Sequence, residues 1–164
     1  MPLHGKGMLI VYNEVKPPHE RDFNEWYNRE HIDERVNLPG FHRARRYVAV
    51  RASPKYLATY ECDTVADLAT PGYLALLANQ TPWSQAMMAR FTHFQRLTLR
   101  VQVDLAHGAG GALTTVRGLP TTTTTYHGVA TGLKDVWLAV EEAIEGVVNH
   151  RTLAELTVSA ISTT

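Results

Sequence analysis

The sequence of 164 residues predicts an α+β fold whose elements follow the order β-α-β-β-α-β, with a shorter segment after them. Three observations predict this order. Apolar runs rich in β-forming residues recur along the chain, a long amphipathic helical segment follows the first run, and Pro and Gly separate the segments. The composition, 45% hydrophobic and 20% charged, agrees with one globular domain and an appendage.

The first half of this unit is a buried strand followed by a long helix. Residues 7–15, GMLIVYNEV, form an almost continuous apolar run that ends before a Pro-Pro pair. Residues 18–41 then show helical periodicity up to the sequence NLPG. Pro39 disfavours helical geometry in the residue before it, and Gly40 accepts a turn conformation, so the helix ends there.

The second half consists of a hairpin, a broken helical region and a last strand. Residues 41–51 alternate, which places Phe41 and Arg45 on one face of a strand and Arg46 on the other. A short connection leads to a strand at 56–62. Short helices are expected at residues 65–69, 73–79 and 83–90, and a fourth strand at residues 94–105.

Residues 1–106 therefore form a predicted ferredoxin-like domain, an antiparallel sheet with helices on one face. The other face of such a sheet needs cover, and a second copy of the chain can provide it, so a homodimer is expected. Residues 107–164 begin with a Gly-rich joint and form a C-terminal β-α-β extension, an incomplete second repeat. Its elements are a strand at 112–119, a helix at 133–148 and a strand at 152–161.

The long helix carries the most informative pattern. At about 100° per residue, six residues share one arc of roughly 140°: Phe23, Trp26, Tyr27, Glu30, His31 and Glu34. The three aromatic residues indicate that this arc faces the sheet, and Arg35 falls on the solvated side. A lone carboxylate buried in an apolar interior costs several kcal/mol, so Glu30 and Glu34 need partners, water or a raised pKa. A ligand cavity satisfies this need better than a dry core.

Glu30, His31 and Tyr27 are the predicted catalytic residues. Two glutamates one turn apart at low dielectric titrate jointly, so one pKa rises and the pair can pass a proton. His31 lies within side-chain reach of Tyr27 and Glu34 on a helix. These groups suit acid/base chemistry on a carbonyl, enol or phenol.

Further residues are expected to bind the substrate. Strand alternation sends every second side chain toward the helices, although parity alone does not select the face. The candidates are Asn13, Trp26, Glu34, Arg45, Tyr60 and Trp83. A purely structural interpretation is also open, in which Glu30 and Glu34 pair with Arg43 or Arg45 and His31 bonds a backbone carbonyl.

Composition excludes several classes of function. With 16 basic and 16 acidic residues the formal charge is zero, which argues against nucleic acid as a partner. No leader and no apolar run of membrane-spanning length occurs, so we expect a cytoplasmic protein without a membrane partner. The single cysteine, Cys62, excludes a disulfide framework. No metal-ligand spacing or nucleotide-binding motif is present, so no metal site is expected.

The residues FNEWYNREHIDERVNLPGFHRARRY resemble the first helix and second strand of the dimeric α/β-barrel superfamily, in particular the EthD and antibiotic-biosynthesis-monooxygenase groups. The resemblance covers about residues 8–103. It implies a homodimer that pairs sheet to sheet, with a ligand cavity between each sheet and its helices. Members include cofactor-free oxygenases, cyclases, isomerases and dehydratases, and some bind haem, for which His31 or His93 is the candidate ligand here.

The expected function is that of a cofactor-independent enzyme, of oxygenase, cyclase, isomerase or lyase type. Its substrate would be a small apolar or aromatic oxygenated molecule, bound in the cavity beneath the helix. The alternative is a non-catalytic protein that binds a small molecule in the same cavity. A third interpretation gives the dimer a purely structural role.

Overall fold

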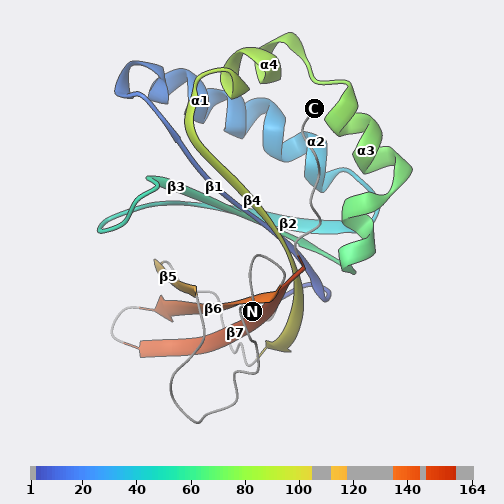
Figure 1. The fold of residues 1–164 in the computed structure, drawn as a ribbon, viewed down its shortest axis with the longest axis vertical. Helices are drawn as coiled ribbons and strands as arrows, with labels where there is room; N and C mark the ends of the chain where they lie inside the picture. Colours follow the sequence, from blue (N-terminus) through green and yellow to red (C-terminus); the bar gives the residue numbers. More distant parts are fainter. Residues whose placement is uncertain (1–2, 105–111, 118–134, 145–146, 158–164) are drawn as a thin grey trace.

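The computed structural model describes residues 3–104, 112–117, 135–144 and 147–157. Over these residues the chain has the predicted α+β class. The strands form one antiparallel sheet in the order β2-β3-β1-β4-β7-β6-β5. Helices cover one side of strands β1–β4 (Figure 1).

Strands β1–β4 agree closely with the sequence pattern. β1 (Gly7–Val15) and β3 (Tyr56–Cys62) have the predicted bounds, whereas β2 (Phe41–Val48) ends earlier and β4 (Phe91–Asp104) begins earlier than predicted. β1 pairs with both β3 and β4, which explains its almost unbroken apolar sequence: both of its faces are buried.

The long helical segment is not one regular helix. It consists of the 3-10 turn η1 (Pro17–His19), α1 (Glu20–Trp26), the π-helical turn η2 (Tyr27–His31) and α2 (Ile32–Val36). In η2 the backbone N–H of Ile32 donates to the carbonyl of Tyr27, five residues earlier. A π turn accommodates one extra residue, so residues after it are displaced by about 100° relative to a regular helix.

This displacement decides which side chains face the sheet. His31 and Arg35 are buried, 6% and 3% exposed, while Glu30 and Glu34 are only partly buried. The prediction that Arg35 lies on the solvated side was wrong, because it assumed regular α geometry through η2. Arg35 occupies the inward position that a regular helix would give to Glu34.

The second helical region has the predicted breaks. It contains the 3-10 helix η3 (Val65–Ala69), α3 (Pro71–Ala78) and α4 (Pro82–Met88). Both α-helices have proline at their first position, where its missing N–H costs nothing. The hydroxyls of Thr70 and Thr81 cap them by accepting from backbone N–H groups.

A β-bulge in β2 reverses the predicted parity of its arginines. Phe41 pairs with Cys62 and Arg43 with Glu61, so the register shifts between them. After this shift Arg46 lies opposite Ala58, a residue of the helix-side core. Arg45 therefore lies on the other face of the sheet. The prediction that Arg45 belongs to the site on the helix side was wrong, because it did not allow for the bulge.

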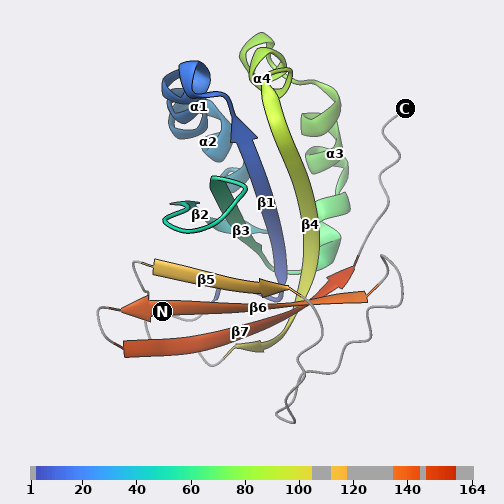
Figure 2. The same cartoon turned by 60° about the vertical axis from the view of Figure 1, so that its left-hand side comes forward.

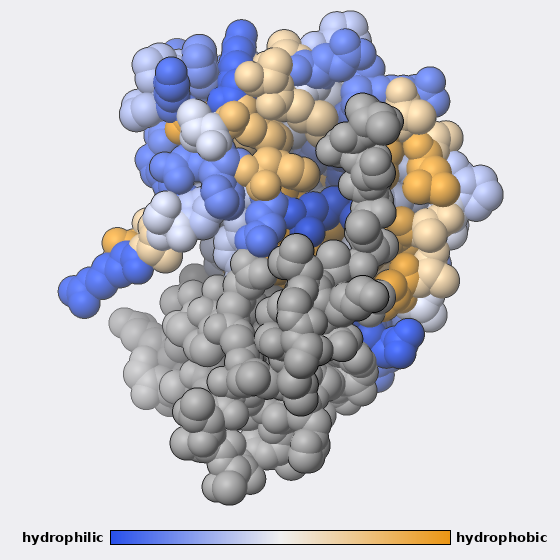
Figure 3. Space-filling model, in the orientation of Figure 1, coloured by the Kyte–Doolittle hydropathy of each residue, from blue (hydrophilic) through white to orange (hydrophobic). Residues whose placement is uncertain are grey.

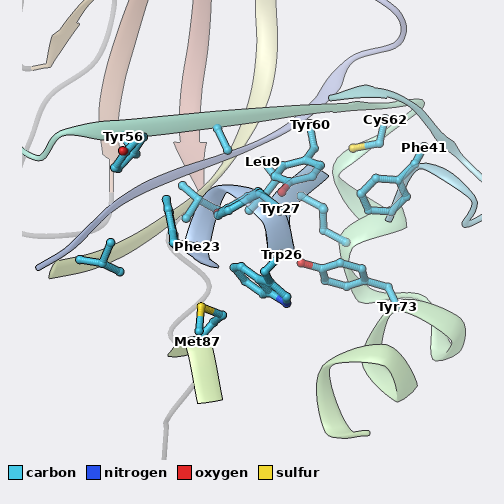
Figure 4. Close-up of a cluster of buried hydrophobic side chains, with 14 residues drawn as sticks. Leu9, Phe23, Trp26, Tyr27, Phe41, Tyr56, Tyr60, Cys62, Tyr73 and Met87 are labelled. Carbon is cyan, nitrogen blue, oxygen red and sulfur yellow. The ribbon is translucent and has the colours of Figure 1, made fainter. Parts of the chain in front are cut away.

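Two apolar clusters flank the sheet. The cluster on the helix side is rich in aromatic rings, including Phe23, Trp26, Tyr27 and Tyr60 (Figure 4). The cluster on the other face contains Ile10 and Leu99, both fully buried within the single chain, together with Met8, Leu97 and Val101. The sequence analysis expected a second copy to bury this face. In the structure it is buried without one, and it looks toward β5–β7 (Figure 2).

The C-terminal extension differs from the predicted β-α-β order. The strand predicted at 112–119 is β5 (Ala112–Arg117), but the predicted helix at 133–148 is wrong, because residues 135–144 form β6 (Asp135–Ile144). β7 (Val147–Thr157) follows and pairs with both β6 and β4. The short apolar run at 136–140 fits a strand period as well as a helical one, and two neighbouring strands supply its backbone partners. The predicted joint at residues 107–111 lies outside the described residues.

The β2–β3 hairpin projects from the molecule (Figure 3). Val50 in its loop is 93% exposed, and Val48 at the end of β2 is 58% exposed. The tip therefore contributes little to either core.

The π turn predicts an order of mutational effects that a regular helix would reverse. Arg35→Ala removes a buried side chain and its bond to the carbonyl of His31, so we expect a loss of about 2 kcal/mol or more in the free energy of unfolding. Glu34→Gln keeps the shape of a partly exposed group and should cost less than about 1 kcal/mol. Urea unfolding measures both. A larger loss for Glu34→Gln would contradict the π turn.

Candidate functional site

A hydrogen bond between sheet and helix lies at the centre of the predicted site. The side-chain amide of Asn13 donates to the hydroxyl oxygen of Tyr27 at 2.8 Å, and both residues are about 1% exposed. Burial raises the pKa of Tyr27, although Asn13, Arg46 and Arg35 act to lower it. The Tyr60 hydroxyl also lowers this pKa, but burial has the largest effect, so the phenol stays protonated at neutral pH.

His31 packs between two aromatic rings of its own helix. Its ring centroid lies 4.0 Å from that of Trp26 and 4.8 Å from that of Tyr27. Its Nδ1 is buried and has no hydrogen-bond partner among the described residues. Burial, followed by the charges of Arg35 and Arg46, lowers the pKa of His31 well below 6.5. The imidazole is therefore neutral at physiological pH.

Two guanidinium groups surround this centre. Arg35 donates to the backbone carbonyl of His31 at 3.0 Å and contacts the Glu34 carboxylate at 3.4 Å. Arg46 lies over the ring of Tyr27, 3.9 Å from its centroid, and donates to Asn24 at 2.8 Å. Burial lowers the pKa of Arg46. A cation stacked on the phenol and another beside the imidazole make the local potential positive.

Glu30 has hydrogen-bond partners that the sequence analysis did not predict. A single oxygen of its carboxylate accepts from the indole of Trp26 at 3.2 Å, from Thr81 at 2.6 Å and from Ser84 at 3.0 Å. Thr81 and Ser84 begin α4, and Ser84 is fully buried. Glu30 therefore fastens α4 to the long helical segment.

Glu34 and Arg43 also find partners that the sequence analysis did not assign. Burial raises the pKa of Glu34, Arg35 lowers it, and Glu30 raises it further. Arg43 forms a two-pronged ion pair with Glu61, with bonds of 2.8 and 2.9 Å. Arg43 therefore pairs with Glu61 and not, as the structural interpretation expected, with Glu30 or Glu34.

Of the predicted binding residues, Asn13, Trp26 and Tyr60 lie at this site and Trp83 does not. Tyr60 is fully buried, and within the described part of the chain its hydroxyl forms no hydrogen bond of regular geometry, although it lies close enough to the Tyr27 hydroxyl to lower the pKa of Tyr27. Burial raises its pKa well above the usual value. The indole of Trp83 instead donates to Asp22 at 3.0 Å, near the start of the helical segment.

Sequence reasoning missed the two cations of the site. Arg35 was placed on the wrong side of the helix and Arg46 on the wrong face of the strand. Each error has one cause, a single extra residue in η2 and in β2 respectively. No local sequence signal marks either irregularity.

The arrangement of the histidines and carboxylates bears on the metal and haem expectations. Among the described residues, no three His, Cys, Asp or Glu side chains gather closely enough to hold a metal ion. His93 is exposed on β4, and His31 is enclosed by Trp26 and Tyr27. An axial ligand must present a nitrogen to the flat porphyrin, so these surroundings do not fit haem.

Comparisons with known proteins add no assignment, because no protein-family model and no curated protein matches the chain. Over the described residues, none of the helices has both the length and the apolar composition needed to cross a membrane.

The lowered pKa of His31 predicts a pH-dependent stability. In the unfolded chain His31 takes up a proton near pH 6.5, whereas the folded protein resists protonation until its lower pKa is reached. Between these values the unfolded state holds more protons, so the free energy of unfolding falls as the pH decreases, by at most about 1.4 kcal/mol per pH unit. Urea unfolding above and below pH 6.5 measures this slope. His31→Gln should reduce it and His19→Gln should not; an unchanged slope in His31→Gln would contradict the assignment.

The two buried tyrosines should differ in their contribution to stability. Tyr27→Phe leaves the Asn13 amide buried without its acceptor, so we expect a loss of about 1–3 kcal/mol. Tyr60→Phe removes a hydroxyl that no described residue bonds, and should change stability by less than about 0.5 kcal/mol. Thermal or urea unfolding of the matched pair tests this, and equal losses would show that Tyr60 has a structural partner.

Proposed function

We propose that this chain is a cofactor-independent enzyme of ferredoxin-like fold that moves a proton on a small oxygenated molecule, with His31 as the base. The strand order β2-β3-β1-β4, with helices on one face, supports the fold assignment because the β-α-β-β-α-β unit has this arrangement. It also supports the resemblance to the EthD and antibiotic-biosynthesis-monooxygenase groups.

The state of His31 is the observation that carries the proposal. A general base must be unprotonated and must have a lone pair that no other group uses. His31 is neutral because of burial and neighbouring cations, and its Nδ1 bonds none of the described residues. A buried polar atom without a partner costs free energy, and such atoms concentrate at functional sites.

The two arginines stabilise the negative charge that forms when a weak base such as His31 removes a proton. When a C–H or O–H bond of the substrate breaks, the proton passes to His31 and the electron pair stays on the substrate as an enolate or phenolate. Arg35 and Arg46 stabilise this anion, and their effect is large because the site has a low dielectric constant. Return of the proton from the imidazolium to another substrate atom completes an isomerisation or exchange.

Tyr27 and Asn13 orient the substrate in this scheme. Asn13 donates to the Tyr27 oxygen, so the phenolic O–H is left to donate to a substrate oxygen. Trp26 is a rigid apolar wall, held by Glu30 and Ser84. We do not propose a proton shuttle through Glu30, because a carboxylate oxygen of Glu30 accepts the hydrogen bonds that hold α4 against the helical segment.

The hydrogen bonds of Glu30 to α4 favour a second candidate function, in which the protein binds the small molecule without changing it. Without a second carboxylate the site has a single titrating group, which suffices for binding and for simple proton exchange. Native mass spectrometry separates the candidates. A bound molecule recovered chemically unaltered, with no exchange of its hydrogens, favours the binding protein. A homodimer through the sheet face is not part of the proposed enzyme, because the apolar cluster on that face, which includes Ile10 and Leu99, is buried in the single chain.

Hydrogen exchange tests the proposed reaction without knowledge of the natural substrate. Acetylacetone, acetoacetate and resorcinol each carry exchangeable C–H groups, and NMR in D2O follows the loss of their signals. We expect catalysed exchange of at least one, reduced about 10²- to 10⁴-fold by His31→Gln. The acid limb of the pH profile should lie well below pH 6.5, because the pKa of His31 is lowered.

His19→Gln is the matched control, since His19 lies in η1, apart from the site. It should leave exchange unchanged. Catalysed exchange that survives His31→Gln at full rate would exclude His31 as the base.

A further inference from the structure

A second group of donors lies in the same layer, between α3 and β4. Arg96 of β4 donates through Nη2 to the hydroxyl oxygen of Tyr73 at 3.1 Å. Tyr73 belongs to α3 and is 1% exposed. Figure 4 shows the hydroxyl of Tyr73 turned toward Trp26 and the hydroxyl of Tyr60 turned toward Tyr27. Arg96 and Tyr73 therefore meet under α3, and Tyr60 lies close enough for Tyr73 to act on its pKa.

The strand register places this group on the helix side of the sheet. Leu9 of β1 pairs with Tyr60 on one side, and Val11 pairs with Arg96 on the other. Leu9 and Val11 both belong to the helix-side core. Tyr60 and Arg96 thus project from neighbouring rows of the same face, toward α3.

Two of these donors have no partner among the residues that the structure describes. They are the hydroxyl of the fully buried Tyr60 and the buried Nε of Arg96. In the same part of the chain no carboxylate is bonded to Arg96, whereas Arg43 and Arg90 bond Glu61 and Asp22. A cation and two O–H groups are therefore gathered without an anion.

The chemistry of these donors selects a ligand. Arg presents N–H groups in a planar fork that matches the two oxygens of a carboxylate, and charge-assisted bonds of this kind are the strong ones. A tyrosine hydroxyl adds a directional donor. Arg46 is less suited to this role, because its N–H groups bond Asn24 and Asn28 and its face lies on Tyr27.

We propose that the molecule bound at this site is a small organic acid whose carboxylate is held by Arg96, Tyr73 and Tyr60. The inference rests on the proposed function and specifies its substrate: an acid with an activated C–H, as in an oxo acid. Tyr60 lies beside Tyr27 (Figure 4), and the ring of Tyr27 contacts that of His31. An acid anchored here therefore presents its neighbouring carbons toward Tyr27 and His31. The broken C–H bond gives its proton to His31, and the electron pair moves onto the adjacent carbonyl oxygen.

Binding of benzoate and of its neutral analogue benzamide tests the proposal. Calorimetric or NMR titration of the full chain should show saturable binding of benzoate, at least tenfold tighter than that of benzamide. Arg96→Gln should weaken benzoate about 10- to 100-fold, since bonds to charged groups are worth about 1.5–3 kcal/mol. Tyr60→Phe should weaken it about tenfold.

The control is Arg100→Gln, which removes the same charge from an exposed position of the same strand. It should bind benzoate as the unmodified chain does. Tyr60→Phe provides a second test if Arg96→Gln fails to fold, because no described residue depends on that hydroxyl.

Several outcomes overturn the proposal. The proposal is wrong if the chain shows no saturable binding of benzoate, or if it binds benzamide as tightly as benzoate. It is also wrong if both Arg96→Gln and Tyr60→Phe bind benzoate as tightly as the unmodified chain. If inorganic phosphate displaces benzoate and binds with equal affinity, the site is a general anion site. His31→Gln separates this inference from the proposed reaction. It should abolish hydrogen exchange and keep benzoate affinity within about twofold. If the chain binds benzoate but catalyses no hydrogen exchange, the carboxylate site is retained and the proposed reaction is rejected. If it catalyses exchange but does not bind benzoate, the reaction is retained and the carboxylate site is rejected.

Discussion

The extra residue in the π turn is the constraint on which the site depends. Tyr27–His31 complete a turn in which the backbone bonds reach back five residues, so everything after them is displaced by about 100°. Without this turn, Glu34 would face the sheet beside Glu30 and two carboxylates would share the space. With it, Arg35 faces inward beside His31, which the regular helix also places inward. One residue thus changes the sign of the charge beneath the helix.

The positive potential that results is balanced by contacts at the edges of the site. Arg35 contacts Glu34 at the periphery, and Arg46 rests on the Tyr27 ring. Glu30 accepts from Thr81 and Ser84, in the bonds that hold α4. The carboxylates bond groups of the surrounding helices. The centre of the site therefore contains hydrogen-bond donors and one neutral acceptor, His31. His31 stays uncharged because burial, and then the charges of Arg35 and Arg46, lower its pKa.

Most of the fold was predictable from sequence, whereas the charges of the site were not. Strands β1 and β3, the prolines that begin α3 and α4, and the inward faces of Trp26 and Tyr27 follow from periodicity and turn chemistry. The errors at Arg35 and Arg45 come from single-residue irregularities, which change the phase of a pattern without changing its residues. The helix predicted at 133–148 failed for another reason. A five-residue apolar run fits both periods, and only its pairing with β5 and β7 decides between them.

The unpartnered groups also explain why this arrangement need not be optimal for stability. A buried donor or acceptor without a partner costs about 1–3 kcal/mol, and His31 and Tyr60 each carry one over the described residues. The aromatic cluster around Phe23 and Trp26 offsets such costs, because its large rings are almost completely removed from water. If stability alone had determined these positions, apolar side chains of similar volume would satisfy them better. Their polarity therefore agrees with the proposed role in binding, in which a ligand supplies the partner that these groups lack among the described residues.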